Sequence, residues 1–490
     1  MFRKNHLVKI NLPGGIIAAG DLYTIVEAAG RARVGECCFG TRQQLYCKVS
    51  DAHSAAFFRE LEQAGIFFES DSDLHPNIVS SYVTEAVLGR SAWVSEGLYK
   101  DILQGFDFRP RLKINLVEAS QGLIPLFTGH LNFISSAINN HWHLFVRRPG
   151  TNELYAWKAG IYSPDIPRIS RLIEECLLGP DAAWGDQLYA AVQSRGAFPE
   201  EPVPPPLEQP PLTVPYYEGF NRYGSKSWLG IYRREELFPI DFLKAVCLIC
   251  FQTKIGQLYT TPWKTLLIKG IEDQDLPIWE FALGKHRINV RHASGELNWQ
   301  MEDFCPEGLR LKRFLVRQFD QDDIRTEGLT FSIKTRKGSG LSGSIIIRKQ
   351  ESLRPGQLKL LDRYEIHHTQ GFDPHSKEYV MYRKDLEKEN LFPYLVSLCK
   401  EFYRLQNEKA ALPVVAGTLP GTQSPLSERT LYRCRHCLTC YDEQFGDPDN
   451  GITAGTSFEA ISSAYSCGVC GAPGTDYIPI EKSPITIVPL

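Results

Sequence analysis

The sequence of 490 residues carries almost no net charge, because its 54 lysines and arginines nearly balance its 57 aspartates and glutamates. This balance gives no electrostatic basis for nucleic-acid or membrane partners, and we expect neither. A long hydrophobic run is also missing: the longest, residues 122–138, is interrupted by His130 and Asn132 and is too short to cross a bilayer. The N-terminal segment does not resemble a secretion signal. We therefore predict a cytoplasmic protein.

Two proline-containing stretches divide the chain. Residues 198–215 are so rich in proline that we expect an extended, semi-rigid spacer, whereas residues 411–429 mix Pro, Gly, Ser and Thr and predict a more flexible linker. They separate an N-terminal part, residues 1–197, from a central part, residues 216–410, and a small C-terminal part, residues 430–480. The hydrophobic content of 43% is ample for several buried cores.

The N-terminal and central parts alternate strand-like and helix-like segments in the same order. FGTRQQLYCKV in the first part carries Thr41-Arg42-Gln43 where YTTPWKTLLIKGI in the second carries Thr261-Pro262-Trp263. The shared order and the shared threonine-containing turn predict two copies of one α+β unit. The alternative is a chance similarity between two unrelated α+β domains.

Thirteen cysteines, an odd number with two tight C-x-x-C pairs near the C-terminus, indicate a reducing compartment and a metal site rather than a disulfide framework. Cys434 and Cys437 form one pair, Cys467 and Cys470 form the other, and 29 residues separate the pairs. A C-x-x-C turn directs two thiolates toward one point, so two facing turns make a tetrahedral sulfur cage. Tetrahedral sulfur accepts either iron or zinc.

The residues around these pairs follow a more specific pattern, which is Tyr432, Tyr441-Asp442, Gly446-Asp447-Pro448, Gly451-Ile452, Gly455-Thr456, Phe458, Tyr465 and Gly471-Ala472. This segment resembles the rubredoxin family. The resemblance implies one iron ion held by Cys434, Cys437, Cys467 and Cys470, which changes between ferrous and ferric in single-electron steps. It also implies redox partner proteins: a reductase as donor and an acceptor, such as a nitrite or sulfite reductase. Zinc in the same four thiolates remains an alternative without redox activity.

Three residues depart from the family pattern. Leu438 stands where the first turn usually carries Gly, and Gly468 stands where the second usually carries Pro. Because glycine lets the backbone direct its N–H toward sulfur, we expect Leu438 to affect the first turn and the reduction potential. Cys440 is additional, and we interpret it as a small apolar residue in the packing, with a ligand role as the alternative.

The large body has a resemblance of its own. LPGGIIAAGDLYTIVEAAGRARVGECCFGTRQQLYCKV, HPNIVSS and RPRLKINL resemble segments of the ferredoxin-like half domains in siroheme-dependent nitrite and sulfite reductases, and TTPWKTLLIKGI resembles their second copy. The resemblance implies an α+β fold: two ferredoxin-like half domains of the nitrite/sulfite-reductase type in a pseudo-two-fold arrangement, followed by a small rubredoxin-like, metal-bound β domain.

Enzymes of this type hold siroheme, a cofactor with many carboxylates, through arginine and lysine, because a polyanion requires cationic partners. Transferred by position, the resemblance gives the candidate cofactor-binding residues Arg42, Arg111 and Lys113 in the first copy and Lys264, Arg287 and Arg291 in the second. For each residue taken alone, a solvated surface cation is the alternative.

The cysteine spacings that bind the four-iron cluster of those enzymes are missing. The stretch that corresponds to them, residues 288–347, contains only Cys305. We therefore expect no 4Fe–4S cluster. Because those enzymes couple siroheme to this cluster, the sequence gives little reason to expect siroheme chemistry.

These observations predict an electron-transfer protein with a rubredoxin-type iron site, linked to nitrite or sulfite reduction. One alternative is an oxidoreductase that binds siroheme or a related tetrapyrrole in the body. Another is a zinc-stabilised binding or assembly protein. Whether the chain is an enzyme stays open on the sequence alone, because fold analogy by itself does not establish an activity.

Overall fold

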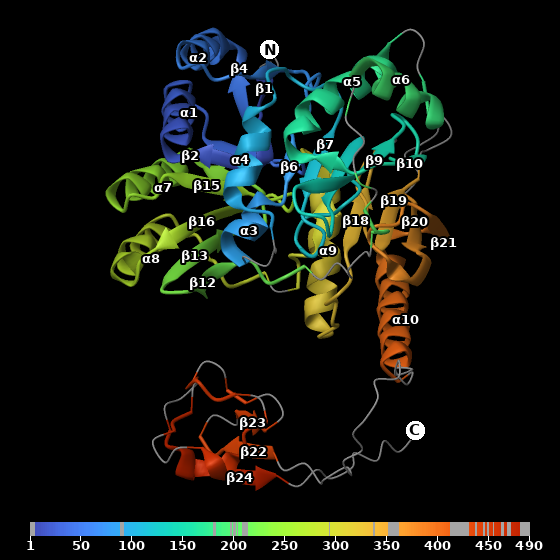
Figure 1. Ribbon diagram of the computed structural model, residues 1–490. Coiled ribbons are helices and arrows are strands. Elements are labelled where there is room, and N and C mark those ends of the chain that lie inside the picture. The colour runs from blue at the N-terminus through green and yellow to red at the C-terminus, as the bar shows by residue number, and fades with distance from the viewer. Residues whose placement is uncertain are drawn as a thin grey trace. The chain divides into compact units, whose positions relative to one another are not determined.

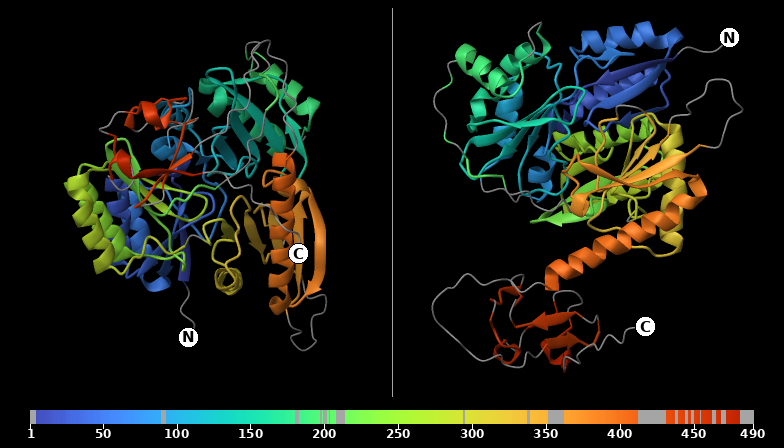
Figure 2. Two further views of the ribbon diagram at one scale, coloured as in Figure 1. Left: turned by 90° about the horizontal axis from the view of Figure 1, so that it is seen from below. Right: turned by 90° about the vertical axis from the view of Figure 1, so that its right-hand side faces the viewer.

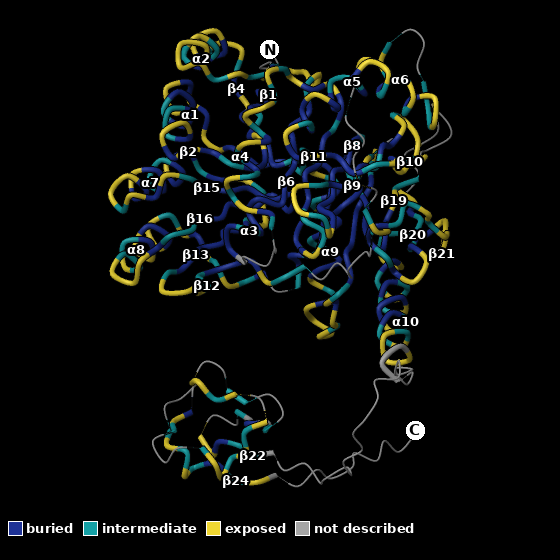
Figure 3. Tube along the Cα trace, viewed as in Figure 1, coloured by how far each residue is buried: buried dark blue, intermediate teal, exposed yellow. Residues whose placement is uncertain are grey.

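The structure is a computed structural model. It describes residues 5–88, 93–179, 183–196, 198, 202, 204–207, 214–293, 295–336, 339–350, 362–411, 431–436, 439–443, 446–447, 450–453, 455–461, 465–467 and 472–480. The chain divides into two compact units, Met1–Ala411 and Leu412–Leu490, and each has buried hydrophobic clusters of its own (Figure 1, Figure 3). In the described residues, no helix has the length and apolar character needed to cross a membrane.

The first half of the large unit begins with an α/β layer and continues into a second, mixed sheet. Its elements are β1 (Asn5–Ile10), β2 (Ile16–Ala18), α1 (Ala19–Arg31), β3 (Glu36–Phe39), β4 (Leu45–Ser50), α2 (Asp51–Gln63), β5 (Glu69–Ser70), β6 (Val79–Ser80), α3 (Tyr82–Leu88), α4 (Glu96–Gln104), β7 (Ile114–Val117), β8 (Leu131–Ser135), β9 (His141–Arg147), β10 (Leu154–Ala156), β11 (Ile161–Tyr162), α5 (Ile166–Leu178) and α6 (Asp186–Gly196).

The second half repeats this order with fewer helices after its mixed sheet. Its elements are β12 (Gly219–Tyr223), β13 (Lys226–Ile231), β14 (Phe238–Pro239), α7 (Ile240–Gln252), β15 (Gln257–Thr260), β16 (Leu266–Ile271), α8 (Leu276–Lys285), β17 (Trp299–Met301), α9 (Pro306–Gln321), β18 (Phe331–Lys334), β19 (Ile345–Lys349), β20 (Tyr364–Thr369), β21 (Tyr379–Leu386) and α10 (Leu391–Ala411).

The two halves exchange a strand with each other. Strand β14 of the second half joins the first sheet, whose order is β14-β3-β4-β1-β5, and β2 of the first half joins the sheet β12-β13-β16-β15-β2. In both halves the exchanged strand directly precedes a helix, and these helices, α1 and α7, pack against each other (Figure 1, Figure 2). Small or apolar buried residues, among them Ala28, Ala29, Val246 and Cys247, line their inner faces. The predicted repeat is therefore a pseudo-two-fold pair.

The mixed sheets repeat as well. In the order β6-β7-β8-β9-β10 the first two pairings are parallel and the last two antiparallel, and β17-β18-β19-β20-β21 has the same sequence of pairings. The registers agree, since Ile114 lies opposite Leu131 in one sheet and Phe331 lies opposite Ile345 in the other. Equivalent positions of the two halves can therefore be assigned residue by residue.

The turns between the paired strands are also equivalent, with an offset of one residue from the sequence match. Gln43 and Lys264 both adopt positive φ, at 63° and 60°, and their amides donate to the carbonyls of Gly40 and Thr261. Arg42 thus corresponds to Trp263, and Gln43 to Lys264.

The small unit is a three-stranded antiparallel sheet in the order β23-β22-β24, with β22 (Leu431–Cys434), β23 (Cys440–Asp442) and β24 (Tyr477–Ile480). Helix α10 ends at Ala411, and the other residues of the predicted linker 411–429 lie outside the described residues. Most of residues 198–215 do so too. The domain boundaries remain predictions.

Candidate metal centre and cationic cavity

Two turns of the small unit have the same backbone geometry. The Cys434 amide donates to the carbonyl of Thr439 at 2.9 Å, and the Cys467 amide donates to the carbonyl of Ala472 at 2.7 Å. In both cases the first cysteine of a C-x-x-C pair bonds to the residue five positions further on. The first cysteine of each pair therefore makes the same backbone hydrogen bond. The second members of the pairs, Cys437 and Cys470, lie outside the described residues, together with Leu438 and Gly468.

An aromatic shell surrounds the two described cysteines. Cys434 is 0% exposed and Cys467 is 2% exposed. They belong to one buried cluster whose aromatic members are Tyr432, Tyr441, Phe458, Tyr465 and Tyr477. Phe458 stacks on Tyr432 with ring centroids 4.3 Å apart. Water is excluded from sulfur here, which is the environment that protects metal–thiolate bonds and tunes their redox potential.

The described donors fit a cysteine-bound metal. Two buried cysteines, Cys434 and Cys467, lie in one cluster, and each is the first member of a C-x-x-C pair in the sequence. Soft thiolate ligands in a closed site select iron or zinc. Cys440 begins β23 and pairs in register with Arg433, and its interpretation as a packing residue stays a prediction.

A cavity of about 850 Å³ lies between the two mixed sheets of the large unit. A smaller hollow of about 300 Å³ adjoins it and shares Lys113, Thr128 and Arg336 with it. Cationic side chains from both halves line the larger cavity, and they are Lys113, Arg147, Lys334, Arg336, Arg348, Lys349 and Lys377. The lining carboxylates are only Glu365 and Asp385. The cavity is therefore strongly positive.

Few of these cations have an anionic partner. Lys349 pairs with Asp362 at 2.9 Å and with Glu307. For the other six cations, no carboxylate of the described residues lies within ion-pair distance. Lys334 and Arg348 are even direct cross-strand neighbours in the β18–β19 register. Like charges in such positions are destabilising, so the arrangement is one that a bound anion would relieve.

The pKa values of three lining groups are lowered, first by burial and then by neighbouring cations, as expected in a positively charged cavity. Burial, and then the nearby Arg348, lower the pKa of Lys334 to about 8. Burial, followed by Arg147 and Lys334, holds the pKa of Lys377 well below its usual value. Burial and then Lys113 lower the pKa of His130 to about 4. The His130 ring is therefore neutral at physiological pH.

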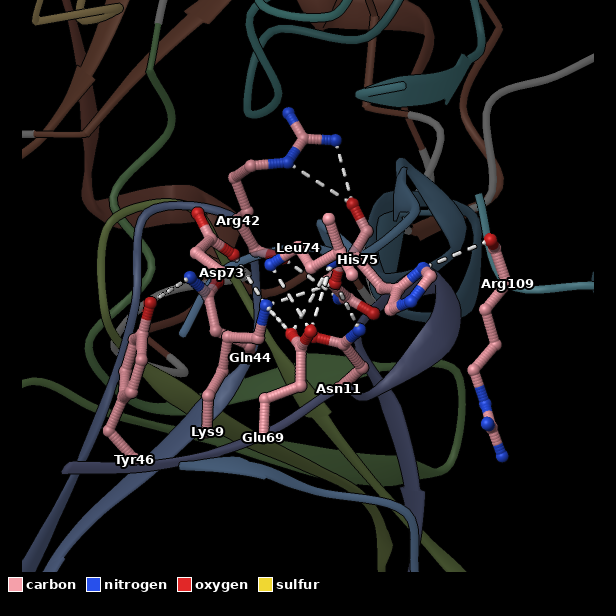
Figure 4. Close-up of polar contacts among 11 residues, drawn as sticks. Lys9, Asn11, Arg42, Gln44, Tyr46, Glu69, Asp73, Leu74, His75 and Arg109 are labelled. Atoms are coloured by element: carbon pink, nitrogen blue, oxygen red, sulfur yellow. Dashed lines mark hydrogen bonds and ion pairs between the residues drawn. The ribbon is translucent and has the colours of Figure 1, made fainter. Parts of the chain in front are cut away.

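Arg42 sits at the adjoining hollow and is anchored by the backbone (Figure 4). Its guanidinium donates to the carbonyl of Asn77 at 2.7 and 3.1 Å and to that of Ile114 at 2.9 Å. The Asn77 side chain returns a bond to the Arg42 carbonyl at 2.8 Å. Burial lowers the pKa of Arg42 to about 10, so it remains charged at physiological pH.

The segment that carries Asn77 is itself fixed by a buried ion pair. Lys9, 2% exposed, pairs with Glu69 and Asp73 and donates to the carbonyl of His75 at 3.0 Å (Figure 4). Glu69 accepts from the amides of Leu74 and His75 at 3.1 and 3.2 Å. These contacts hold the loop after β5 in one conformation, and through it they fix the direction of Arg42.

Of the six predicted cofactor-binding residues, the structure brings Arg42 and Lys113 together at the hollow. Lys264 lines neither cavity but lies behind the wall of the hollow: it is 4% exposed, and its ammonium pairs with Glu236 at 2.6 Å and with Asp303, a lining residue of the hollow, at 3.3 Å. Burial lowers its pKa, but Glu236 and Asp303 outweigh burial and leave that pKa above the usual value.

The other three predicted residues are exposed. Arg111 uses its backbone amide to contact Glu174 at 2.7 Å, and its side chain lines neither cavity. Arg287 follows the end of α8 with φ of 55°, and Arg291 lies four residues further on. None of the three has a role that the described contacts define, and their assignment stays a prediction.

Sequence reasoning missed the cations of the second half. Lys334 ends β18 and Arg336 follows two residues later, and Arg348 and Lys349 end the neighbouring strand β19. The available signal was IKTRK and IIIRK: two apolar segments that are each followed by basic residues. Because β18 and β19 are parallel, their basic ends meet at one edge of the sheet.

The body cysteines do not form a cluster site in the described residues. Cys305 caps α9 by accepting from the Gly308 amide at 3.2 Å, and it contacts the Thr335 hydroxyl at 3.0 Å. Cys247 and Cys250 are 0% exposed on the buried face of α7. Across the described residues, no group of three or more His, Cys, Asp or Glu side chains is arranged to hold a metal.

The fold and the buried cysteine turns of the small unit define a class of protein, the small cysteine-ligated metal domains. The Rubredoxin family model matches residues 431–477. Rubredoxin 4 of Rhodococcus sp. (strain Q15) is 38% identical over 56 residues, which are 11% of this chain and 93% of the relative. Rubredoxin-2 of Chlorobaculum tepidum is 39% identical over 49 residues, 10% of this chain and 94% of the relative. Through this domain the chain belongs to the rubredoxin family, which implies an iron ion in a cysteine site and a redox partner.

The large unit is similar to a solved structure. The NirA protein of Mycobacterium tuberculosis superimposes with a TM-score of 0.60 at 15% identity, over 82% of this chain and 81% of that chain. This similarity concerns the fold, and it confirms the predicted nitrite/sulfite-reductase-like body. The predicted combination of such a body with a C-terminal rubredoxin domain is therefore confirmed.

Proposed function

We propose that this protein is an electron carrier whose single iron ion is bound by Cys434, Cys437, Cys467 and Cys470. The observation that carries the proposal is the pair of equivalent turns that place Cys434 and Cys467 in a dry aromatic cluster. The iron would supply one-electron chemistry, ferric to ferrous and back. A reductase would deliver the electron, and the acceptor would be a component of nitrite or sulfite reduction.

The residues around the proposed iron site support this role because they exclude water and leave no room for a substrate. The aromatic rings keep water from the sulfurs, and the sheet fixes the turns so that ligand geometry changes little between the two charge states. A tetrahedral thiolate site without an open position has no place for a substrate, so it suits electron transfer rather than substrate chemistry.

The first experiment is a visible absorption spectrum of the untagged full chain, purified from a host that makes siroheme, before and after dithionite. Ferric tetrathiolate bands that bleach on reduction support the carrier. Cys434→Ser and Cys467→Ser should each abolish these bands, whereas Cys305→Ser, which replaces the sulfur cap of α9, should keep them. A colourless protein from a host that loads iron into other rubredoxins would refute the proposal and leave the zinc alternative.

A second candidate function rests on the cationic cavity. A volume of about 850 Å³ with seven lining cations and two carboxylates fits a polycarboxylate, such as a tetrapyrrole with acidic side chains, better than a neutral ligand. Arg42 and Lys113 at the adjoining hollow would bind one edge of it. The body would then be the oxidoreductase part or the anion-binding part of the protein.

Two measurements test this candidate. Intense tetrapyrrole bands in the purified protein would support it directly. For protein purified without them, titration with uroporphyrin at low and high salt should show binding that weakens as salt rises. No binding at low salt would refute the polycarboxylate site and would leave the electron carrier unaffected.

A further inference from the structure

Two cysteines of the body face each other across a buried hairpin. Cys37 on β3 pairs in register with Cys47 on β4, and each is 1% exposed. Their sulfur atoms lie 2.8 Å apart. Cys38, the neighbour of Cys37, pairs instead with Tyr46, and it belongs to the opposite face of the strand because successive side chains alternate. The contact is therefore specific to one pair of thiols.

The backbone of this hairpin suits a bond between the two sulfurs. The Gly40 amide donates to the carbonyl of Gln44 at 2.8 Å, so Gly40 and Gln44 form a hydrogen-bonded pair. Hydrogen-bonded and non-hydrogen-bonded pairs alternate along an antiparallel ladder, which makes Cys37 and Cys47 a non-hydrogen-bonded pair. The Cα atoms of such a pair are about 4.5 Å apart, within the range of about 4.4–6.8 Å that a disulfide spans. The two strands can therefore accept a disulfide where they already lie.

The second half shows that packing alone does not require cysteine at this place. By the correspondence of the hairpin turns, Leu258 and Ile268 take the positions of Cys37 and Cys47. They also pair in register, and each is 0% exposed. The same backbone pair is thus filled by two aliphatic side chains in one half and by two side chains that can be joined covalently in the other.

We propose that Cys37 and Cys47 are a redox modification site, which forms a disulfide when hydrogen peroxide oxidises the protein and returns to two thiols when a dithiol reduces it. The peroxide O–O bond breaks first, one sulfur becomes a sulfenic acid and one water leaves. The other sulfur then attacks, so that the S–O bond breaks, the S–S bond forms and a second water carries away the last hydrogen. Two thiols lose two electrons, and the peroxide gains them.

The environment of the pair makes the first step slow and the second fast. The contact with Cys47, and then burial, hold the pKa of Cys37 well above its usual value, so Cys37 keeps its hydrogen at physiological pH. Because a protonated thiol reacts slowly, the pair stays reduced until peroxide accumulates. Once one sulfur is oxidised, the other is already beside it, and this proximity favours the disulfide over further oxidation.

The disulfide would fasten the hairpin that carries Arg42. The two cysteines are ten positions apart, and Arg42 lies midway between them in the turn. Closing this loop removes conformations from the unfolded chain and keeps β3 paired with β4. The exchanged strand β14 pairs with β3 at the same residue, since Phe238 lies opposite Cys37. Oxidation would therefore stabilise the edge at which the two halves join.

The test is peptide mapping of the purified full chain after treatment with hydrogen peroxide, with the remaining thiols alkylated under denaturing conditions. Trypsin places Cys37 in residues 34–42 and Cys47 in residues 43–48. The expected product is a linked pair of these two peptides, lighter than their sum by two hydrogen atoms. Dithiothreitol should separate them again.

Cys38 provides the matched control, because it is buried beside Cys37 and lies in the same peptide. Cys37→Ala and Cys47→Ala should each lose the linked peptides, whereas Cys38→Ala should keep them. Wild type treated in urea is a second measurement that needs no variant. The folded chain should give the link between Cys37 and Cys47 alone in this region, and the unfolded chain should give mixed links.

A link that survives Cys37→Ala and disappears in Cys38→Ala would overturn the inference. So would sulfinic acid without a link in the folded chain, or two intact thiols in the folded chain together with a link in the unfolded chain. None of these results depends on the iron site or on the cationic cavity, whose own tests are separate.

Discussion

The two halves of the body share a backbone and differ in where they place charge. At the end of the second strand of the mixed sheet, the first half has Val117 and the second half has Lys334, and on the next strand Ile134 corresponds to Arg348. Val117 and Ile134 are 0% exposed core residues, whereas Lys334 and Arg348 line the cavity. The same strand ends thus complete a core in one half and line a cationic cavity in the other.

In the hairpin turns, by contrast, it is the first half that places a cation at a cavity. Arg42 of the first half reaches the hollow, but its counterpart Trp263 is buried and donates from Nε1 to the carbonyl of Leu123 in the other half at 2.7 Å. Gln43 makes neutral contacts with Thr260 and Ser80, whereas Lys264 is an ion-paired ammonium. The duplicated scaffold therefore specifies the backbone, and single side chains decide whether a position stabilises or binds.

Replacing Lys264 of the second turn with glutamine, the residue at the equivalent position of the first turn, should have the largest effect on stability. Lys264→Gln leaves Glu236 and Asp303 as buried charges without their cation, and it should destabilise the protein by about 3–5 kcal/mol. Urea unfolding measures this difference. The control is Lys269→Gln, the same change on β16 at a partly exposed pair with Glu96, with an expected cost below about 1 kcal/mol. Equal costs would contradict the buried-charge explanation.

Replacing Lys334 and Arg348 of the second mixed sheet with the apolar residues at the equivalent positions of the first should weaken anion binding. Lys334→Val with Arg348→Ile deletes two lining cations, and at roughly tenfold for each, the affinity for uroporphyrin should fall about 100-fold. Absorption titration at fixed salt measures it. Arg111→Ala and Arg287→Ala remove exposed cations that do not line the cavity, and each should leave the affinity unchanged. A loss in these controls as large as in the double variant would show nonspecific attraction.

Removing the contact between the halves at Trp263 should have a smaller effect. Trp263→Phe keeps an aromatic ring but leaves the buried carbonyl of Leu123 without its donor, with an expected cost of about 1–3 kcal/mol. Trp93→Phe removes a comparable N–H bond, to the Ser136 carbonyl at 2.9 Å, from a partly exposed indole. Thermal unfolding should show the smaller loss for Trp93. The reverse order would argue against an interface role for Trp263.

The smallest effect concerns pH. Lys334 has a pKa of about 8 in the folded protein against the ordinary value of 10.5 in an unfolded chain, so between these values the unfolded chain binds more protons. Stability should therefore rise with pH across this window, by about 2 kcal/mol between pH 7.5 and pH 10 from this group. Lys334→Met should reduce the rise, measured as unfolding free energy at pH 7.5 and pH 10, while the lowered pKa of Lys377 leaves part of it in place. Anion affinity of the wild type should fall over the same window, and a rise would contradict the assignment.

The sequence predicted those features that depend on local spacing. Two C-x-x-C pairs predicted two equivalent turns, and Cys434 and Cys467 lie in such turns. The repeated threonine-containing segment predicted the repeated hairpin, with an offset of one residue because Gly40, not Thr41, begins the first turn. Such features need only the hydrogen-bonding and conformational preferences of a few neighbouring residues.

The cavity could not be predicted in this way. Its cations come from the ends of strands in both halves and from a loop before β21, and they meet only after the sheets form. Lys264 is basic in the sequence and sits in the expected turn, yet Asp303, which is 39 residues further on, pairs with it. Whether a lysine binds a cofactor or a carboxylate depends on such distant neighbours.

The exchange of strands β2 and β14 between the two halves resembles the exchange between the subunits of a domain-swapped dimer, but here both partners belong to one chain. Each sheet ends on a strand that the other half supplies, so either half expressed alone would present an unpaired edge at β3 or β15. A separate half would therefore be prone to associate with a second copy or to aggregate. Because each sheet needs a strand from the other half, the two halves fold as one unit. Their equivalent positions can nevertheless carry different side chains, as Val117 and Lys334 do.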